Sequence, residues 1–287
     1  IWVERIKDLK PDILFSFYYR KIIKPTILNI PPKGCLNLHG ALLPKYRGSA
    51  PINWMLINGE NEGGVTLHYM THKPDEGDII AQKGFEIQLK DTSKTLNNKV
   101  TQVSAVMLNE ILPQIKNGTA PRFPQDHAKS SYYGRRSPED GEIDWNTSAS
   151  NVYNLVRALT RPYPGAFSYL NKQKCFFWKV TEAKVKIDNA PPGTILTNEP
   201  LTIACAQGAI VVDFAQIEGE IYMNGERLSN ENKLENGMSF GTSFISQKEK
   251  SRKKSVLILG VNGFIGNHLS ERLLKSGKYT VHGMDLH

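Results

Sequence analysis

The chain has 287 residues, of which 40% are hydrophobic and 22% charged, and these shares exclude an intrinsically disordered protein. The formal net charge of +8 suits anionic small molecules, but the basic residues are dispersed apart from one cluster in 248–254, which we interpret as a solvated linker. No apolar run is long enough to span a bilayer and no secretory signal opens the chain, so we expect no membrane insertion.

The first 40 residues alternate helix and strand. Apolar residues at helical spacing over 2–9 precede a buried strand at 12–17, and a second helix over 25–30 precedes a strand that contains Asn37. This alternation is the βαβ rhythm of a parallel sheet, and such sheets bind ligands at the carboxyl ends of their strands. The segment 18–23 occupies one of these ends.

The stretch 35–40, C-L-N-L-H-G, carries the candidate catalytic residues. Alternation along a strand places Asn37 and His39 on one face, and the glycine and Leu-Leu-Pro turn that follow predict that the strand ends there. Imidazole can transfer a proton near neutral pH and an amide can hydrogen-bond an oxygen that becomes negative, so the pair suits acyl transfer. A satisfied histidine beside a turn is the alternative. Asp75, in the loop after a strand at 64–70, favours the catalytic interpretation.

The middle of the chain contains a long amphipathic helix and a change of pattern. The helix spans 94–116, and its apolar stripe indicates core packing: Leu96, Val100, Val103, Met107, Ile111 and Ile115. Residues 121–139 are irregular and polar, typical of an inter-domain connection. A helix capped near 146–148 follows, with apolar Val152, Leu155, Val156 and Leu159. From 167 to 240, short strands broken by Gly, Pro and Asn predict a small β-barrel.

The cysteines and histidines indicate neither disulfides nor a metal. Cys35, Cys175 and Cys205 lie far apart with no C-x-x-C pair, so we expect reduced, buried thiols in a cytoplasmic protein. His68 and His72 are four apart, as in a helical metal pair, but they fall on a strand and the loop after it, and no Glu accompanies them. We therefore expect no metal site.

The end of the chain has the pattern of a dinucleotide-binding domain. After a linker-like segment at 241–254, a buried strand at 255–259 runs into G-V-N-G-F-I-G, then a helix over 267–275 and a strand at 279–284. Glycines after a strand let the backbone approach a pyrophosphate, and an acid ending the next strand binds the ribose hydroxyls and favours NAD over NADP. The residues assigned to this cofactor site are Gly260, Gly263, Gly266 and Asp285.

Three ordered motifs, N-L-H-G-x-L-L-P-K-Y-R-G-x-A-P-I-N-W, G-V-T-L-H-x-M and D-x-G-D-I-I, resemble the 10-formyltetrahydrofolate-dependent formyltransferases. Within that family the chain resembles, over nearly its whole length, the formyltransferase half of bifunctional polymyxin-resistance enzymes. Those enzymes formylate UDP-4-amino-4-deoxy-L-arabinose and oxidatively decarboxylate UDP-glucuronate in lipid A and lipopolysaccharide biosynthesis. The glycine spacing of the tail is similar to that of extended short-chain dehydrogenases, but the chain stops at His287, before any catalytic Tyr-x-x-x-Lys.

The resemblance implies an α/β fold in three parts. A Rossmann-like formyltransferase domain, truncated at its N-terminus, would span 1–138 and an OB-like β-barrel 139–240. A linker at 241–254 would lead to the first βαβ unit of a truncated NAD-binding Rossmann dehydrogenase domain at 255–287. In that family two strands with their crossovers precede the position of Ile1, so we expect the chain to be an internal fragment of a longer protein. The resemblance also implies a homo-oligomer, because those enzymes are hexamers.

For the site, the resemblance implies that Asn37, His39 and Asp75 are catalytic. We assign proton transfer to His39 and oxyanion stabilisation to Asn37, and we expect Asp75 to raise the pKa of the imidazole. The formyl donor would be 10-formyltetrahydrofolate, held by Lys21, Ile22, Ile23, Ser49, Thr71, His72, Lys73, Pro74 and Asp75. Ser49 stands where the resembled enzymes carry an arginine.

Three functions compete on this sequence. The favoured one is a sugar-nucleotide amine formyltransferase fused to an NAD-dependent dehydrogenase, with a UDP-amino sugar and UDP-glucuronate as small-molecule substrates. The second is methionyl-tRNA formyltransferase, which would end at the barrel, so the dinucleotide motif argues against it. The third is a nucleic-acid-binding OB protein with an inactive N-terminal half, against which the intact catalytic residues argue. No basic stripe with interleaved aromatics is evident on the barrel, so we expect no nucleic-acid partner.

Overall fold

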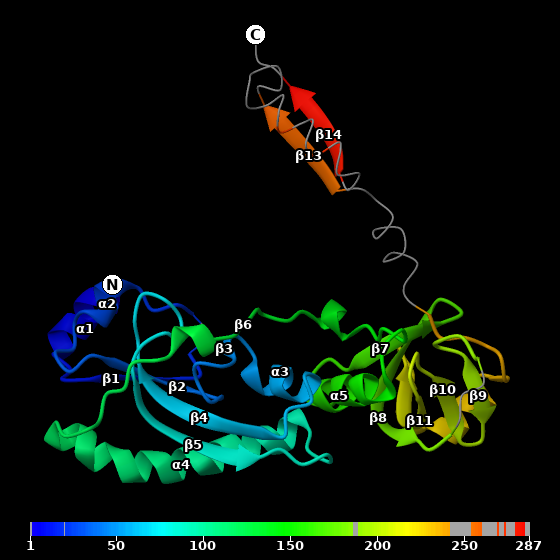
Figure 1. The fold of residues 1–287 in the computed structure, drawn as a ribbon, viewed down its shortest axis with the longest axis horizontal. Helices are drawn as coiled ribbons and strands as arrows, with labels where there is room; N and C mark the ends of the chain where they lie inside the picture. The colour runs from blue at the N-terminus through cyan, green and yellow to red at the C-terminus, as the bar shows by residue number, and fades with distance from the viewer. Residues whose placement is uncertain are drawn as a thin grey trace.

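The computed structural model describes residues 2–19, 21–185, 189–241, 254–259, 269, 273 and 279–284. They form an α/β domain, a connecting segment, a β-rich domain and a final pair of strands (Figure 1). Helices α3 (Pro51–Ile57) and α5 (Ala149–Leu159) lie against each other between the α/β sheet and the β-rich sheet.

The first domain is built on a four-stranded sheet in the order β1-β2-β4-β5. Helix α1 (Trp2–Leu9) precedes β1 (Leu14–Phe17), and the short helix α2 (Pro25–Leu28) joins β1 to the parallel strand β2 (Cys35–His39), as predicted.

The other half of this sheet is antiparallel. Strand β4 (Glu62–Tyr69) runs antiparallel to β2, and β5 (Ile79–Glu86) runs antiparallel to β4. The expectation of a parallel sheet is therefore wrong for these strands. For β5 the physical reason is the short loop 70–78, which joins it directly to β4, because only antiparallel neighbours can be joined without a crossover.

The long predicted helix is confirmed as α4 (Ser93–Asn117), which packs along β4 and β5 (Figure 1). The Thr92 side chain caps it by accepting from the Thr95 N–H, and Gly118, with φ 74°, ends it. The predicted stripe is buried at Leu96, Val100, Met107 and Ile111. The helix therefore supplies one wall of the core.

Several short elements are not evident in the sequence. Helix α3 starts at a proline in its first turn, where a missing N–H costs nothing. Strands β3 (Arg47–Gly48) and β6 (Tyr132–Tyr133) pair in parallel, and 3-10 turns form at His127–Lys129 and Pro138–Gly141. Because of the β3–β6 pair, the segment between α4 and α5 runs back across the first domain (Figure 1).

The second domain confirms the predicted change to a β-rich pattern. Its six-stranded sheet follows the path β7-β8-β11-β10-β9, with β12 paired to β11, and all of these pairs are antiparallel. The elements are β7 (Ala166–Leu170), β8 (Gln173–Ala183), β9 (Ile195–Asn198), β10 (Leu201–Ala204), β11 (Ala209–Ile217), β12 (Met223–Asn224) and α6 (Gly225–Glu231). The Ser148 side chain caps α5, which packs on β8. Trp145, Phe177 and Phe240 meet in the core.

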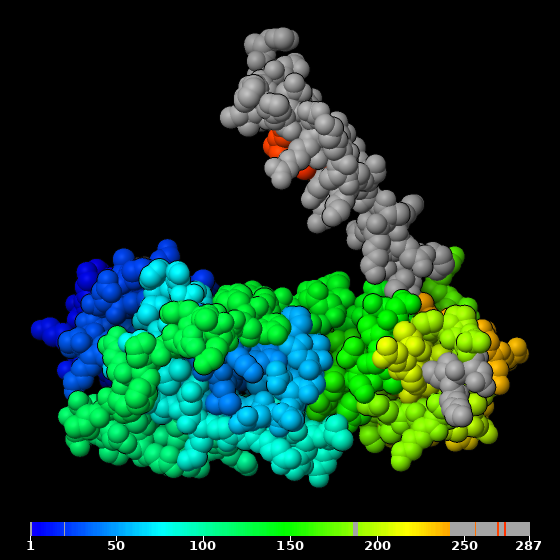
Figure 2. Space-filling model, in the orientation of Figure 1, coloured from blue at the N-terminus to red at the C-terminus, as the bar shows by residue number. Residues whose placement is uncertain are grey.

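Buried polar contacts join the two domains. Asn53 of α3 donates through Nδ2 to the Ala158 carbonyl of α5 (2.8 Å), and Arg157 Nη1 donates to the Asp91 carbonyl (3.2 Å). Figure 2 shows the two lobes in continuous contact along this junction. An unsatisfied buried donor costs about 1–3 kcal/mol, so these bonds hold the β-rich domain against α3 and the start of α4.

The strands expected near the end of the chain are confirmed as β13 (Lys254–Leu259) and β14 (Tyr279–Met284). They form a parallel pair with Val256 opposite Val281. Leu269 and Leu273, the only described residues between them, are helical, in keeping with the predicted helix. A parallel pair needs a crossover of this kind, so the fold agrees with the start of a Rossmann domain.

All three cysteines are buried and free of disulfides, as predicted. Burial raises the pKa of both the Cys175 and Cys205 thiols to about 12. In the described part of the chain, no helix is long and apolar enough to cross a membrane, and no cluster of three or more His, Cys, Asp or Glu side chains could hold a metal ion.

Candidate active site

Strand β2 presents Asn37 and His39 on one face of the sheet and ends at His39, as predicted. The turn that follows is fixed by Thr66, which lies opposite His39 on β4. Its hydroxyl donates to the Ala41 carbonyl (2.6 Å) and accepts from the Leu43 N–H (3.1 Å). The strand therefore stops where its two polar side chains emerge, because the next residues bond to the neighbouring strand's side chain.

The loop between β4 and β5 brings Asp75 to these side chains. The carboxylate is 12% exposed, and its Oδ1 lies 3.7 Å from His39 Nδ1. Its Oδ2 accepts from the Gly48 N–H at 2.8 Å. The loop can approach β4 this closely only at a glycine, since a Cβ on Gly77 would lie 1.9 Å from the Tyr69 carbonyl oxygen.

His68 is a fourth member of the site, although its sequence pattern suggested only a metal ligand, which we rejected. It is 1% exposed and lies directly opposite Asn37 on β4. Its Nε2 is 3.2 Å from Asn37 Nδ2 and 3.5 Å from Asp75 Oδ1. The Nδ1 atom bonds the Tyr69 carbonyl (2.8 Å), so it carries a proton and fixes the ring. Nε2 can then accept from Asn37 or, when protonated, donate to Asp75.

The orientation of His39 leaves one nitrogen for chemistry. Its Nε2 bonds the Tyr46 carbonyl at 2.7 Å, and because a carbonyl only accepts, Nε2 carries a proton. In the neutral ring, Nδ1 is then the basic nitrogen, on the side of Asp75. The Tyr46 contact joins a side chain to a backbone group, so no residue pattern in the sequence could have shown it.

Burial lowers the pKa of His39 below its usual value, and the Asp75 carboxylate offsets only part of that effect. The expectation that Asp75 raises this pKa is confirmed for the contribution of Asp75, but burial outweighs that contribution and the net shift is downward. The physical reason is that the fully enclosed imidazole loses the hydration of its cationic form, and a carboxylate 3.7 Å away restores only part of it.

Asp75 stays ionised in this setting. Burial acts to raise its pKa, but the His68 imidazole 3.5 Å away, the nearby His39 and the Gly48 N–H together outweigh burial and lower the pKa to about 2. At neutral pH the site therefore holds a carboxylate, a neutral basic imidazole at His39 and the amide of Asn37. These groups can accept a proton, stabilise the resulting imidazolium and donate to an oxyanion.

The structure brings only some of the residues expected to hold the formyl donor close to the candidate catalytic groups. Asp75 is at the site, and Ser49 is half-buried beside Gly48, where its N–H donates to the Tyr133 carbonyl (2.9 Å). Thr71, His72, Lys73 and Pro74 are exposed in the loop before Asp75. Lys21 and Ile22 are exposed and Ile23 is half-buried between β1 and α2. Among the described residues, no hydrogen bond joins 21–23 to the 71–75 loop.

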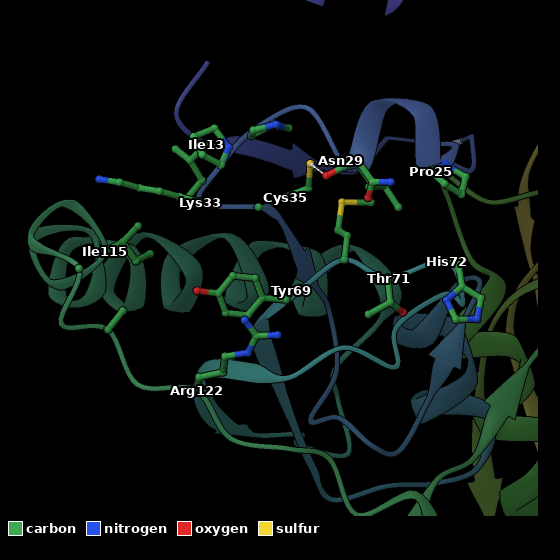
Figure 3. Close-up of a pocket in the computed structure, with 17 residues that line it drawn as sticks. Ile13, Pro25, Asn29, Lys33, Cys35, Tyr69, Thr71, His72, Ile115 and Arg122 are labelled. Carbon is green, nitrogen blue, oxygen red and sulfur yellow. Dashed lines mark hydrogen bonds between the residues drawn. The ribbon is translucent and has the colours of Figure 1, made fainter. Parts of the chain in front are cut away.

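A cavity of about 920 Å³ adjoins this loop (Figure 3). Thr71 and His72 line one end of it together with Pro25, and Ile115 and Lys33 line the other end. Asn37, His39 and Asp75 are not among the lining residues. The cavity therefore touches the predicted donor-binding loop but does not contain the candidate catalytic groups.

The predicted cofactor residues Gly260, Gly263, Gly266 and Asp285 lie outside the described residues. Their flanking strands β13 and β14 are parallel, as a dinucleotide-binding fold requires. The structure gives no geometry for this site, so its assignment to NAD rests on the sequence pattern.

Comparison with known families defines the class of each part. Residues 2–112 match the family described as Formyl transferase, and residues 135–233 match Formyl transferase, C-terminal domain. Residues 256–287 match the NAD dependent epimerase/dehydratase family. The chain thus carries a formyltransferase-fold α/β domain, the β-rich domain that accompanies it and the start of an NAD-binding epimerase-type domain.

Solved structures share the fold. An N-formyltransferase from Helicobacter canadensis, in complex with folinic acid and dTDP-3-aminofucose, is 25% identical with a TM-score of 0.58, over 69% of this chain and 72% of that one. HypX from Aquifex aeolicus, in complex with tetrahydrofolic acid, is 18% identical with a TM-score of 0.60, over 99% of this chain and 53% of that one. This chain therefore spans about half the length of HypX. Methionyl-tRNA formyltransferase from Clostridium thermocellum is 21% identical with a TM-score of 0.52, over 65% and 79% of the two chains.

Proposed function

We propose that the protein transfers a formyl group from 10-formyltetrahydrofolate to a primary amine of a nucleotide sugar. The observation that carries this proposal is that Asn37 and His39 of strand β2 meet Asp75 of the β4–β5 loop, whose Oδ1 lies 3.7 Å from His39 Nδ1 and 3.5 Å from His68 Nε2. The matches to both formyl transferase domains support the reaction class. The folate-type ligands of the H. canadensis and A. aeolicus structures support the donor.

The site supplies what the reaction needs. The neutral amine attacks the formyl carbon, forming a new C–N bond and an anionic oxygen. One of the two Asn37 amide hydrogens donates to that oxygen. His39 Nδ1 accepts the proton released by the amine and delivers it to N10 as the bond between the formyl carbon and N10 breaks. The Asp75 carboxylate stabilises the imidazolium between these steps.

For the acceptor we propose UDP-4-amino-4-deoxy-L-arabinose, in a cytoplasmic pathway of lipid A modification that confers polymyxin resistance. The ordered motifs and the nucleotide-sugar ligand of the H. canadensis structure support this choice. The match at 256–287 supports a fused NAD-dependent domain, for which we propose oxidative decarboxylation of UDP-glucuronate. Within it, Gly260, Gly263 and Gly266 would hold the pyrophosphate of NAD, and Asp285 the ribose.

Methionyl-tRNA is the second candidate acceptor, since methionyl-tRNA formyltransferase from Clostridium thermocellum shares the fold. On the β-rich domain, cations of the protein itself cover aromatic rings. The Arg161 guanidinium lies 4.9 Å from the Trp178 ring centroid, and Lys174 Nζ lies 3.8 Å from that of Phe167. OB-type domains bind nucleic acid by stacking bases on open aromatic faces, whereas these faces are already covered and Phe167 is 3% exposed, so the pairs give the tRNA no stacking surface. The dinucleotide-binding pattern of the tail and the higher identity to the sugar N-formyltransferase favour the sugar.

An acceptor comparison tests the proposal. The complete natural protein receives 10-formyltetrahydrofolate with either UDP-4-amino-4-deoxy-L-arabinose or methionyl-tRNA, and mass spectrometry measures the N-formyl product. We expect formylation of the sugar and none of the tRNA. Efficient formylation of the tRNA that falls steeply with added salt would favour the second acceptor. Absence of formyl transfer to either amine, in protein that binds folinic acid, would contradict the proposed reaction.

A further inference from the structure

Asp75 belongs to a closed ring of buried hydrogen bonds. Gln125, which is 6% exposed, donates through Nε2 to the Asp75 carbonyl (2.9 Å) and the Gly77 carbonyl (2.7 Å). Its Oε1 accepts from Arg47 Nη2 (2.7 Å) and Nε (3.2 Å), and Arg47 is 4% exposed. Gly48, the residue after Arg47, donates its N–H to Asp75 Oδ2 at 2.8 Å. The loop is thus tied to 47–48 through both its backbone and its carboxylate.

The partners of Gln125 determine which way its amide faces. A guanidinium offers only donors, so the amide oxygen faces Arg47 and the two amide hydrogens face the two carbonyls. The reverse orientation would place donors against the guanidinium and an acceptor against two carbonyl oxygens. The backbone of Arg47 is itself fixed, because its backbone N–H donates to the Ser131 carbonyl (2.9 Å) next to the β3–β6 pair. The ring of hydrogen bonds is therefore anchored to the β3–β6 pair, outside the 70–78 loop.

The loop has other contacts after Asp75, where Arg122 Nε donates to Asp78 Oδ2 (2.6 Å) and Arg47 Nη1 lies 3.7 Å from Glu76 Oε1. Residues 71–74 are exposed, so packing of their side chains does not fix the backbone. Asp75 has φ 58°, a left-handed conformation that residues other than glycine rarely adopt. A strained residue persists where surrounding contacts hold it, and here those contacts are the hydrogen bonds from Gln125 and Gly48.

We propose that Gln125 is a positioning residue for the reaction: its two amide hydrogens hold the backbone of 75–77 so that the Asp75 carboxylate stands against His39 and His68. The catalytic consequence rests on the proposed function, whereas the structural consequence rests on the geometry alone. A displacement of about 1 Å at a catalytic group can lower a rate by roughly a hundredfold.

Two substitutions of Gln125 remove its amide hydrogens and keep a side chain of similar length. Gln125→Glu keeps the length and the acceptor for Arg47 but has no hydrogen for the two carbonyls. Gln125→Met removes the hydrogens without adding a charge, and it carries the same expectation should Gln125→Glu fail to fold. Asn53→Asp is the matched control, because Asn53 is also a buried amide (3% exposed) that donates to a backbone carbonyl, that of Ala158.

Hydrogen exchange of the Gly48 amide measures the Asp75 contact without requiring activity, and steady-state kinetics of the complete protein give kcat and KM. In both Gln125 variants we expect Gly48 exchange to accelerate by about tenfold or more. We expect kcat to fall by roughly a hundredfold with KM for the formyl donor changed by less than about threefold. Asn53→Asp should lower the melting temperature and leave Gly48 exchange unchanged.

Two outcomes distinguish the inference from the proposed function. Unchanged Gly48 exchange in folded Gln125 variants would overturn the inference, whatever the activity. Accelerated exchange, in a protein whose unsubstituted form transfers no formyl group, would support the positioning of Asp75 and contradict the proposed reaction. Normal kcat despite accelerated exchange would also overturn the inference, since the held geometry would then have no catalytic role.

Discussion

Asn37 and His68 lie directly opposite each other on antiparallel strands, and 3.2 Å separates Asn37 Nδ2 from His68 Nε2. Because opposite residues of an antiparallel pair share a face, His68 stands on the same side of the sheet as His39. The candidate site is therefore a group of four, in which Asp75 Oδ1 lies between two imidazoles at 3.7 Å and 3.5 Å. Asn37 is fixed by this group and keeps a second amide hydrogen for substrate.

Substitution of His68 should disturb Asp75 more than it disturbs the fold. Among the influences that lower the pKa of Asp75, the largest is the His68 imidazole, whose Nε2 lies 3.5 Å from Asp75 Oδ1. In His68→Leu we therefore expect this pKa to rise from about 2, and kcat to fall by roughly tenfold, less than for the loss of direct proton transfer. A carbon-13 titration of the carboxyl group measures the first effect. An Asp75 pKa that stayed near 2 in this variant would contradict the role given to His68.

Acid should destabilise the folded protein through both His39 and Asp75. The folded-state pKa of each is lower than in the unfolded chain, so the unfolded chain binds more protons and stability falls as pH falls. For His39 the loss begins near the ordinary value of 6.5 and continues down to its lowered pKa. For Asp75 the loss runs from 3.8 down to about 2.

Thermal melts across this pH range test both contributions. His39→Gln should lose the part of the pH dependence that begins near 6.5, because the neutral amide does not titrate. The difference between the two proteins isolates His39 from other groups. If the melting temperatures of the two proteins fell equally as the pH dropped below 6.5, His39 would not be buried in its neutral form.

Gly77→Ala should displace the catalytic loop. A Cβ at this position would lie 1.9 Å from the Tyr69 carbonyl oxygen, a backbone atom that cannot turn aside. The loop must then move away from β4 and carry Asp75 with it, so we expect formyl transfer to fall by roughly a hundredfold. Gly134→Ala is the control, since no atom lies within 4 Å of its added Cβ. Equal activity of the two variants would show that the loop position is unimportant.

Local pattern was sufficient to predict much of the fold. Alternation at 35–39 predicted β2 and its end at His39, the apolar stripe predicted α4, and the polar residues at 146–148 predicted the start of α5. The orientation of β4 and β5 could not be predicted, because alternation has the same period in parallel and antiparallel strands. The βαβ pattern of the first 40 residues correctly predicts that β1 and β2 are parallel, but the parallel arrangement does not continue to β4 and β5.

The site was predicted where a motif marks its residues, as for Asn37, His39 and Asp75, and missed where a residue joins it only through strand register or a distant segment. His68 joins the site only through the register of β2 against β4, which the sequence does not specify. The Gln125 contacts depend on a segment that returns across the domain through the β3–β6 pair. The effect of Asp75 on the His39 pKa could be inferred from the motifs, whereas the larger, opposite effect of burial depends on the whole fold.

The central claim is that His39, assisted by Asp75, transfers the proton during formyl transfer. Its most direct test is the turnover of the complete protein with His39→Ala and, separately, Asp75→Ala, at saturating 10-formyltetrahydrofolate and amine. We expect turnover to fall by roughly a hundredfold or more in each variant, with little change in folding or in folinic acid binding. Turnover equal to that of the unsubstituted protein in His39→Ala would contradict the claim.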